Sequence, residues 1–242
     1  MFYIGKAVPL TDGDFARIAS GFNIEEALVR AVNEVEANGK GFQSSGAVTA
    51  LYEPHWAYKQ SSGSIRSALV KAGIAYQKWG TKPYPKSPYP NIDTCAKIAG
   101  EELAALSTSW GIGQIMGFNH DAAGYSTAVS MVRAFAESEA NQLIGMMHFI
   151  EANPGMMKAL LDKNWAEFAQ RYNGKGYAKN KYDIKLAAAY KRWAEKLKAS
   201  ESVVVPVEQP PVVGVKQSNT TGWISLIAMA AGGIAAYFGW GH

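Results

Sequence analysis

Apolar residues recur at helical spacing through most of the first 200 residues. The pattern predicts a helix over residues 23–35, in which Asn23 is a candidate N-cap and Glu26 completes a capping box. Six further helices are predicted over residues 64–79, 92–106, 127–136, 139–151, 165–172 and 181–198. The last carries an apolar stripe made of Tyr182, Leu186, Ala189, Trp193 and Leu197.

Two stretches interrupt this helical pattern. Residues 39–58 are rich in glycine, serine and aromatic residues, and the segment AVTALY within them predicts a short strand. Residues 81–91 contain four prolines and predict an irregular loop. The expected fold is therefore mainly α (an α+β fold), with a small β insertion directly after the first long helix.

The C-terminal segment 222–240 carries no charged side chain. As a helix its 19 residues would span about 28 Å, close to the hydrocarbon thickness of a bilayer. Trp223 and Trp240 lie at its two ends, as in an aromatic belt. The segment predicts a single transmembrane or anchor helix, and a buried core helix or hairpin is the alternative.

Residues 201–221 contain three prolines and show no helical period. They predict an extended, semi-rigid linker. The expected organisation is thus a catalytic body over residues 1–200, a linker over residues 201–221 and an anchor over residues 222–240. No signal peptide is expected, because the first 21 residues lack the necessary apolar run.

The composition excludes several classes of protein. Hydrophobic residues make up 48% of the chain, so a core can form, and a net charge of +4 is too mild to indicate nucleic-acid binding. A single cysteine rules out an internal disulfide and favours folding in the cytoplasm. The four histidines and one cysteine show no metal-ligand spacing, and no phosphate-binding motif is present. Neither a metal nor a cofactor is expected.

Glu36 is the first candidate catalytic residue. It follows Val29 and Val32 on the apolar side of the predicted helix, where partial desolvation would raise its pKa and keep a proton available to a general acid. A solvent-exposed glutamate at the helix end is the alternative. Glu34 points the other way and continues a row with Glu26 and Arg30, which predicts a solvated charge ladder.

Three further blocks combine polar and aromatic side chains. Glu53 and His55 lie in ALYEPHWAYK, where aromatic rings suit the C–H faces of sugars but also an ordinary core edge. Trp110 and Gln114 lie in SWGIGQIMGFN, and the Gln114 amide can both donate and accept hydrogen bonds. The third block, Tyr172–Tyr177, closes the helix predicted to start at residue 165.

Together with AVNEVEANGKGF, these ordered blocks resemble the phage-type N-acetylmuramidase family of endolysins and prophage wall hydrolases. The resemblance covers about residues 8–195 and implies a lysozyme-like fold. The later two blocks are also similar to motifs of goose-type lysozymes and lytic transglycosylases, whose glutamine and asparagine line the glycan cleft. The resemblance implies that the substrate is bound by Gln114, Tyr172, Asn173, His55 and Trp110.

The resemblance also implies catalytic roles. Glu36 falls on the family's catalytic glutamate, and Glu53 falls on the glutamate of an aromatic–Glu–Arg–His block in which Pro54 replaces the arginine. Many members carry an aspartate where this chain has Ser45. Without that second carboxylate, Glu53 or the hydroxyl of Thr49 is expected to hold the water or to stabilise positive charge.

The expected activity is hydrolysis of the β-1,4 bond between N-acetylmuramic acid and N-acetylglucosamine, with phage release as its purpose. Because a lytic transglycosylase needs only one carboxylate, formation of anhydro-muropeptides is an alternative. A non-catalytic, membrane-anchored wall-binding protein is another. The expected partners are peptidoglycan strands, the membrane and a holin. The enzyme is expected to be made in the host cytoplasm, associate with the inner membrane and act on the periplasmic wall.

Overall fold

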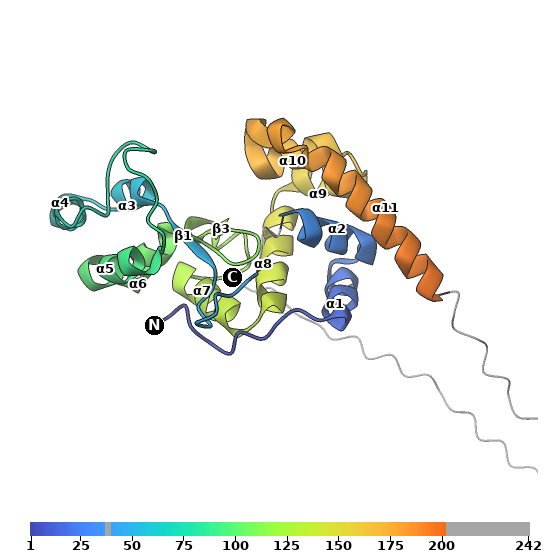
Figure 1. The fold of residues 1–242 in the computed structure, drawn as a ribbon, viewed down its shortest axis with the longest axis horizontal. Helices are drawn as coiled ribbons and strands as arrows, with labels where there is room; N and C mark the ends of the chain where they lie inside the picture. The colour runs from blue at the N-terminus through green and yellow to red at the C-terminus, as the bar shows by residue number, and fades with distance from the viewer. Residues whose placement is uncertain (37–39, 202–242) are drawn as a thin grey trace, which may run out of the picture. The chain divides into compact units, whose positions relative to one another are not determined.

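The computed structural model describes residues 1–36 and 40–201 (Figure 1). All of them belong to one compact unit, Met1–Val204. The predicted anchor and nearly all of the predicted linker lie outside the described residues. Within the described part, no helix combines the length and the apolar character that crossing a membrane requires.

The chain begins with a pair of short helices, α1 (Asp12–Phe22) and α2 (Glu26–Glu36). Thr11 and Asp14 form a capping box at the start of α1. Asn23 adopts a left-handed conformation with φ of 53°, and its N–H donates to the carbonyls of Ala19 and Ser20. The prediction that Asn23 starts a helix is therefore wrong, because it ends α1 instead.

A small antiparallel sheet follows, with strands in the order β1 (Ala50–Tyr52), β2 (Thr108–Trp110) and β3 (Ile115–Met116). Leu51 pairs with Ser109, and Trp110 pairs with Ile115. The predicted strand is confirmed over its second half, and its first half forms only isolated bridges to Ile4 and Phe42. Strands β2 and β3, which lie within or next to the block SWGIGQIMGFN (residues 109–119, the glycine-rich block), were not predicted.

Four helices come between β1 and β2: α3 (Pro54–Gln60), α4 (Gly63–Lys71), α5 (Tyr89–Ala99) and α6 (Glu101–Leu106). The helix predicted over residues 64–79 ends at Lys71, shortly before Gly73 with φ of 75°. The helix predicted over residues 92–106 is broken at Gly100, whose φ of 88° is open to glycine but strained for other residues.

The second half of the chain is helical. It contains η1 (Gly117–Asn119), α7 (Ala128–Glu137), α8 (Glu139–Glu151), α9 (Pro154–Leu161), α10 (Trp165–Asn173), η2 (Gly174–Asn180) and α11 (Tyr182–Glu201). Helix α8 has the predicted bounds and is largely buried, with Leu143, Met146 and Met147 fully enclosed. Helix α11 packs along α2, and Leu186 and Ala189 of the predicted stripe are fully buried.

The predicted charge ladder on α2 is not solvated at its centre. Arg30 is only 6% exposed and forms ion pairs with Asp12 and Glu26 at 2.7 Å. Its guanidinium also lies over the rings of Phe15 and Trp193. The prediction fails because α1 and α11 cover this face of α2, a long-range effect that helical spacing does not reveal.

The elements form two groups within this unit (Figure 1). Helices α3 to α6 lie beside the sheet at one end, and α1, α2 and α9 to α11 lie at the other, with α8 between them (Figure 1). The mainly helical fold with a small sheet is thus confirmed. Residues at the end of α2, in the glycine-rich block and at the end of α10 meet in the middle of this arrangement, as the contacts below show.

Candidate active site

Glu36 is the last residue of α2, and its side chain is buried beside the helix face that carries Val29 and Val32. The residue is 7% exposed. Burial raises the pKa of Glu36 from 4.5 to about 7, while the hydrogen bond from Asn173 and the positive charge of Lys185 partly oppose this shift. Glu36 is therefore a carboxyl group that stays substantially protonated near neutral pH.

Asn173, the last residue of α10, holds this carboxyl group. Its Nδ2 donates to Oε1 of Glu36 at 2.9 Å and to Oε2 at 3.0 Å. The preceding residue, Tyr172, donates from its hydroxyl to the carbonyl of Gly113 at 3.2 Å and stacks on Phe168. Tyr172 thereby fixes the end of α10 against the glycine-rich block.

Gln114 lies in the turn between β2 and β3, where its φ of 47° is unusual for a residue other than glycine. Its Nε2 donates to the carbonyl of Gly111 at 2.9 Å, and its Oε1 accepts from Ser109 Oγ at 2.9 Å. These bonds hold the side chain within its own turn. One amide hydrogen and one oxygen lone pair stay open to a ligand.

Thr49 lies just before β1 and joins two parts of the site. Its backbone N–H donates to the carbonyl of Gly41, and its carbonyl accepts from the N–H of Gly111 at 2.8 Å. Its hydroxyl donates to the carbonyl of Lys40 at 2.6 Å and accepts from Gln43 Nε2 at 3.0 Å. Thr49 is thus bonded to the segment that follows Glu36 and to the turn that carries Gln114.

Gln142 is a buried residue of the site that the sequence analysis missed. It is 1% exposed on α8, where its Oε1 accepts from the N–H of Ile112 at 2.9 Å. Its Nε2 donates to the carbonyls of Phe135 and Gly41, at 3.0 and 3.3 Å. A glutamine on the apolar face of the predicted helix 139–151 was the signal that could have found it. Gln142 thus binds both the segment that contains Gly41 and the turn that contains Ile112, and both segments also bond to Thr49.

Glu53 lies at the other end of β1 from Thr49, as the N-cap residue of α3. The three residues of β1 lie between them, and four steps of extended chain place the two backbones about 13 Å apart. The Glu53 carboxylate accepts from the Tyr84 hydroxyl at 2.7 Å and contacts His55 Nδ1 at 3.2 Å. Glu53 and His55 therefore lie together, but away from the Thr49 end of the strand.

Trp110 is fully buried in the core. Its indole N–H donates to the carbonyl of Ala105 at 3.0 Å, and its ring packs against Phe2 and Tyr3. The prediction that Trp110 contacts the substrate is therefore wrong. The physical reason is that the N-terminal segment folds over the indole ring.

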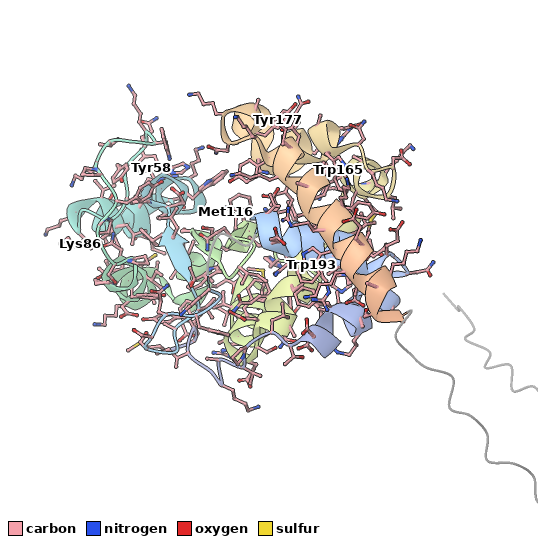
Figure 2. The ribbon with its side chains drawn as sticks, turned by 45° about the vertical axis from the view of Figure 1, so that its right-hand side comes forward. Tyr58, Lys86, Met116, Trp165, Tyr177 and Trp193 are labelled. Atoms are coloured by element: carbon pink, nitrogen blue, oxygen red, sulfur yellow. The ribbon has the colours of Figure 1, made fainter. Side chains whose placement is uncertain are left out.

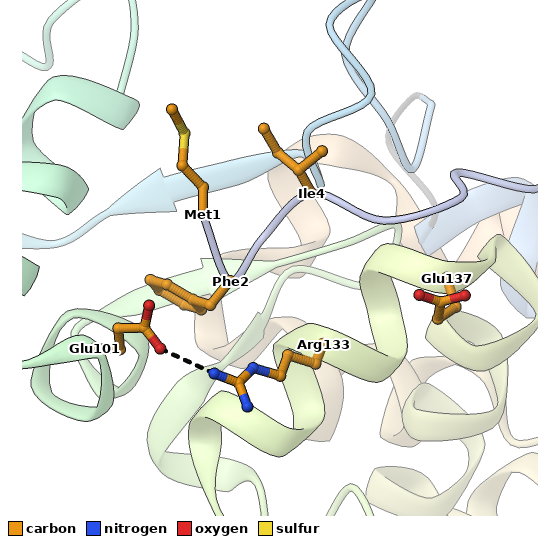
Figure 3. A pocket seen from close by; sticks show the side chains of 6 residues that line it. All are labelled: Met1, Phe2, Ile4, Glu101, Arg133 and Glu137. Atoms are coloured by element: carbon orange, nitrogen blue, oxygen red, sulfur yellow. Dashed lines mark hydrogen bonds and ion pairs between the residues drawn. The ribbon is translucent and has the colours of Figure 1, made fainter.

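No group of three or more histidine, cysteine, aspartate or glutamate side chains in residues 1–36 and 40–201 is placed to hold a metal ion. A cavity of about 380 Å³ lies under the N-terminus and contains the ion pair of Glu101 and Arg133 (Figure 3). None of the residues that line it is a predicted site residue: Met1, Phe2, Ile4, Glu101, Arg133 and Glu137.

Comparison with known proteins identifies the family. The family model described as Muramidase (N-acetylmuramidase) matches residues 25–194, a range that includes all the residues of the site described above. The crystal structure of the Burkholderia AP3 phage endolysin is similar, with a TM-score of 0.70 and 40% sequence identity over 77% of this chain and 72% of that one. No protein with a curated description matches. The chain therefore belongs to the N-acetylmuramidase family of peptidoglycan glycosidases.

Proposed function

We propose that the chain is an endolysin that cleaves the β-1,4 bond between N-acetylmuramic acid and N-acetylglucosamine, with Glu36 as its general acid. Family membership and the similarity to a phage endolysin support peptidoglycan cleavage. The carboxyl group of Glu36 would protonate the glycosidic oxygen as the bond to the leaving sugar breaks. Water would then form a bond to the anomeric carbon of the positively charged muramic ring and release a proton to the Glu36 carboxylate, which restores the acid.

One observation carries this proposal: Glu36 combines burial with a fixed orientation. A general acid needs a pKa near the working pH, and the pKa of Glu36 is raised to about 7 by burial. It also needs its carboxyl plane held in one orientation, and Asn173 contacts both oxygens. Within the neighbourhood that links Asn173, Gln114 and Thr49, Glu36 is the carboxyl group with these two properties.

Thr49 is the residue that we propose to position the water. Its hydroxyl hydrogen is engaged by the Lys40 carbonyl and one oxygen lone pair by Gln43, which leaves one lone pair to accept a water hydrogen. Glu53 is a weaker candidate, because its carboxylate already binds Tyr84 and His55 at the far end of β1. Gln114, Tyr172 and Asn173 would contact or border the sugar next to the scissile bond.

Lytic transglycosylation is the second candidate reaction. It is supported by Ser45, which occupies the place of the family's aspartate and lies in the exposed turn closed by the Gly46 N–H and the Gln43 carbonyl. In that reaction Glu36 would take a proton from the muramic 6-hydroxyl, which would close an anhydro ring. Hydrolysis is favoured by membership in a muramidase family.

The parts outside the catalytic unit complete the proposal. We propose that residues 222–240 attach the chain to the inner membrane through the linker 201–221, and that a holin gives the enzyme access to the periplasmic wall. The chargeless composition of the segment supports the membrane association. Fractionation of cells that express either the full chain or residues 1–200 tests it. Equal membrane content of the two proteins would contradict the anchor.

Product analysis tests the reaction itself. Purified full-length protein is incubated with purified sacculi, and the released fragments are separated by mass. Muropeptides with reducing muramic ends are expected, whereas anhydro-muropeptides would select transglycosylation. Binding to sacculi without any released fragment would instead support a non-catalytic wall-binding protein.

A further inference from the structure

The loop between α4 and α5 carries an exposed aromatic pair, Trp79 and Tyr84. Trp79 is 69% exposed and Tyr84 is 41% exposed, although a large aromatic side chain is normally covered in a folded domain. The loop extends above α3 in Figure 1, and Lys86 marks it at the outer edge of this end of the molecule in Figure 2. The two rings therefore present apolar surface to solvent.

Hydrogen bonds fix the two rings at their edges. The Trp79 indole N–H donates to the Tyr84 hydroxyl at 3.1 Å, and that hydroxyl donates to Glu53 Oε2 at 2.7 Å. Burial and the bond to Glu53 raise the pKa of Tyr84 to about 12, so its hydroxyl keeps its proton at working pH. Since the polar atoms are paired at the edges, the open surface consists of ring faces, which suit the C–H faces of sugars.

The loop is also fixed at its ends. The N–H of Tyr76 donates to the Pro54 carbonyl at 3.4 Å, and the Tyr89 hydroxyl donates to the Val48 carbonyl at 2.8 Å. Prolines at positions 83, 85 and 88 restrict the backbone between them. The aromatic pair is thus bound through Tyr84 to Glu53, the residue that directly follows β1.

The charge of the loop is uniformly positive. Lys78, Lys82 and Lys86 lie in it, and the sequence has no acidic residue between positions 72 and 92. None of these three lysines forms an ion pair with another described residue. Exposed aromatic rings in a loop that also carries unpaired ammonium groups match a glycan that carries carboxylates.

We infer that this loop is a second glycan-binding site. It binds the peptidoglycan strand at sugars that lie away from the bond to be cleaved. Trp79 and Tyr84 stack on a sugar ring, and the lysines attract the carboxylates of the peptide stems. Glu53 is a positioning residue that orients the pair through Tyr84. The inference rests on the proposed cleavage of glycan strands, which supplies the ligand.

The variant Trp79→Ala tests the site in the full-length protein. We expect its dissociation constant for purified sacculi and its KM for soluble, uncross-linked glycan strands each to rise about tenfold, as loss of a central tryptophan contact does. The value of kcat should stay within about twofold, because the reacting bond lies elsewhere. Tyr84→Phe removes the hydrogen bonds to Trp79 and Glu53 but keeps the aromatic ring, so it should raise KM less than Trp79→Ala does.

Ile184→Ala is the matched control, since Ile184 is 61% exposed on α11. It should leave binding and KM unchanged. Wild-type binding and KM in Trp79→Ala, or equal losses in the control, would overturn the inference. If the wild type releases no fragments while Trp79→Ala still loses binding to sacculi, the proposed cleavage fails and the binding site stands.

Discussion

Asn173 Nδ2 lies 2.9 Å from Oε1 and 3.0 Å from Oε2 of Glu36, so one amide group spans both oxygens of the buried carboxyl. These hydrogen bonds favour the charged form of Glu36, and burial favours the neutral form. Burial is the larger effect and raises the pKa of Glu36 to about 7. The relationship gives an acid that is oriented by Asn173 and still holds its proton near neutral pH.

The first prediction concerns the pH dependence of activity. If Glu36 donates its proton, kcat/KM for soluble glycan strands should fall as the pH rises through about 7. The fall should approach about tenfold per pH unit above that value. Initial rates between pH 5 and 9 measure this fall, which is the high-pH limb of the kcat/KM profile. A rate that stays constant across this range would show that the acid has a different pKa.

The second prediction concerns the pH dependence of stability. Folded Glu36 keeps its proton up to about pH 7, whereas its usual pKa is 4.5. The folded state therefore binds more protons between these values, and stability falls as the pH rises through this window. The variant Glu36→Gln lacks this loss, so its gain in melting temperature over the wild type should be larger at pH 8 than at pH 5. An equal difference at both pH values would contradict the burial of the charge.

The third prediction concerns Asn173. The variant Asn173→Ala removes both hydrogen bonds that favour the carboxylate, so the limb in kcat/KM should move to higher pH. The value of kcat should fall by about 10- to 100-fold, because the carboxyl group is no longer oriented. Asn164→Ala, at the start of the same helix, is the control and should leave the limb in place. A loss of activity without a shift of the limb would indicate a merely structural role.

The fourth prediction concerns Thr49. The variant Thr49→Val keeps the shape of the side chain but loses the hydroxyl that bonds to Lys40 and Gln43. Hydrolysis should fall about 100-fold, and the share of anhydro-muropeptides among the products should rise, because the muramic 6-hydroxyl replaces the missing water. Thr49→Ser should retain hydrolysis. Full turnover to reducing ends by Thr49→Val would exclude Thr49 as the residue that holds the water.

The fifth prediction concerns the buried amide of Gln142. The variant Gln142→Leu leaves the buried Ile112 N–H without its partner, while the Gly41 carbonyl keeps its hydrogen bond from the Thr49 N–H. A buried N–H without a partner should lower the free energy of unfolding by about 1–3 kcal/mol. Gln170→Leu on the exposed surface of α10 is the control and should change it by less than about 0.5 kcal/mol. Denaturant unfolding at neutral pH measures both variants.

Features that depend on local spacing were predictable from the sequence. Helical periodicity placed Glu36 on the same face as Val29 and Val32, and the structure buries all three. The start of α8 at Glu139 follows from Ser138, whose side chain accepts a hydrogen bond from the Asn141 N–H and caps the helix. Asn23 was assigned to the wrong helix end, because asparagine suits both an N-cap and a left-handed C-cap.

Features that depend on distant parts of the chain were not predictable. Trp110 was expected to bind the sugar, but Phe2 and Tyr3 from the N-terminal segment pack against its ring. Arg30 was expected in solvent, but Trp193 from α11 lies over it. Glu53 was expected as an alternative to Thr49 for holding the water, and its hydrogen bond from Tyr84 of the proline-rich loop could not be predicted from the sequence.

The central claim is that Glu36 supplies the proton that breaks the glycan, and one measurement tests it most directly. Wild type, Glu36→Gln and Glu34→Gln are incubated with purified sacculi. The released muropeptides are identified by their mass, and their amounts are compared. Glu34 is the matched control, because it lies two residues away and binds Arg192 and Trp193 instead. We predict a loss of at least about 1,000-fold for Glu36→Gln, with wild-type folding and binding, and near wild-type release for Glu34→Gln. Release of muropeptides by folded Glu36→Gln at the wild-type rate would contradict the claim.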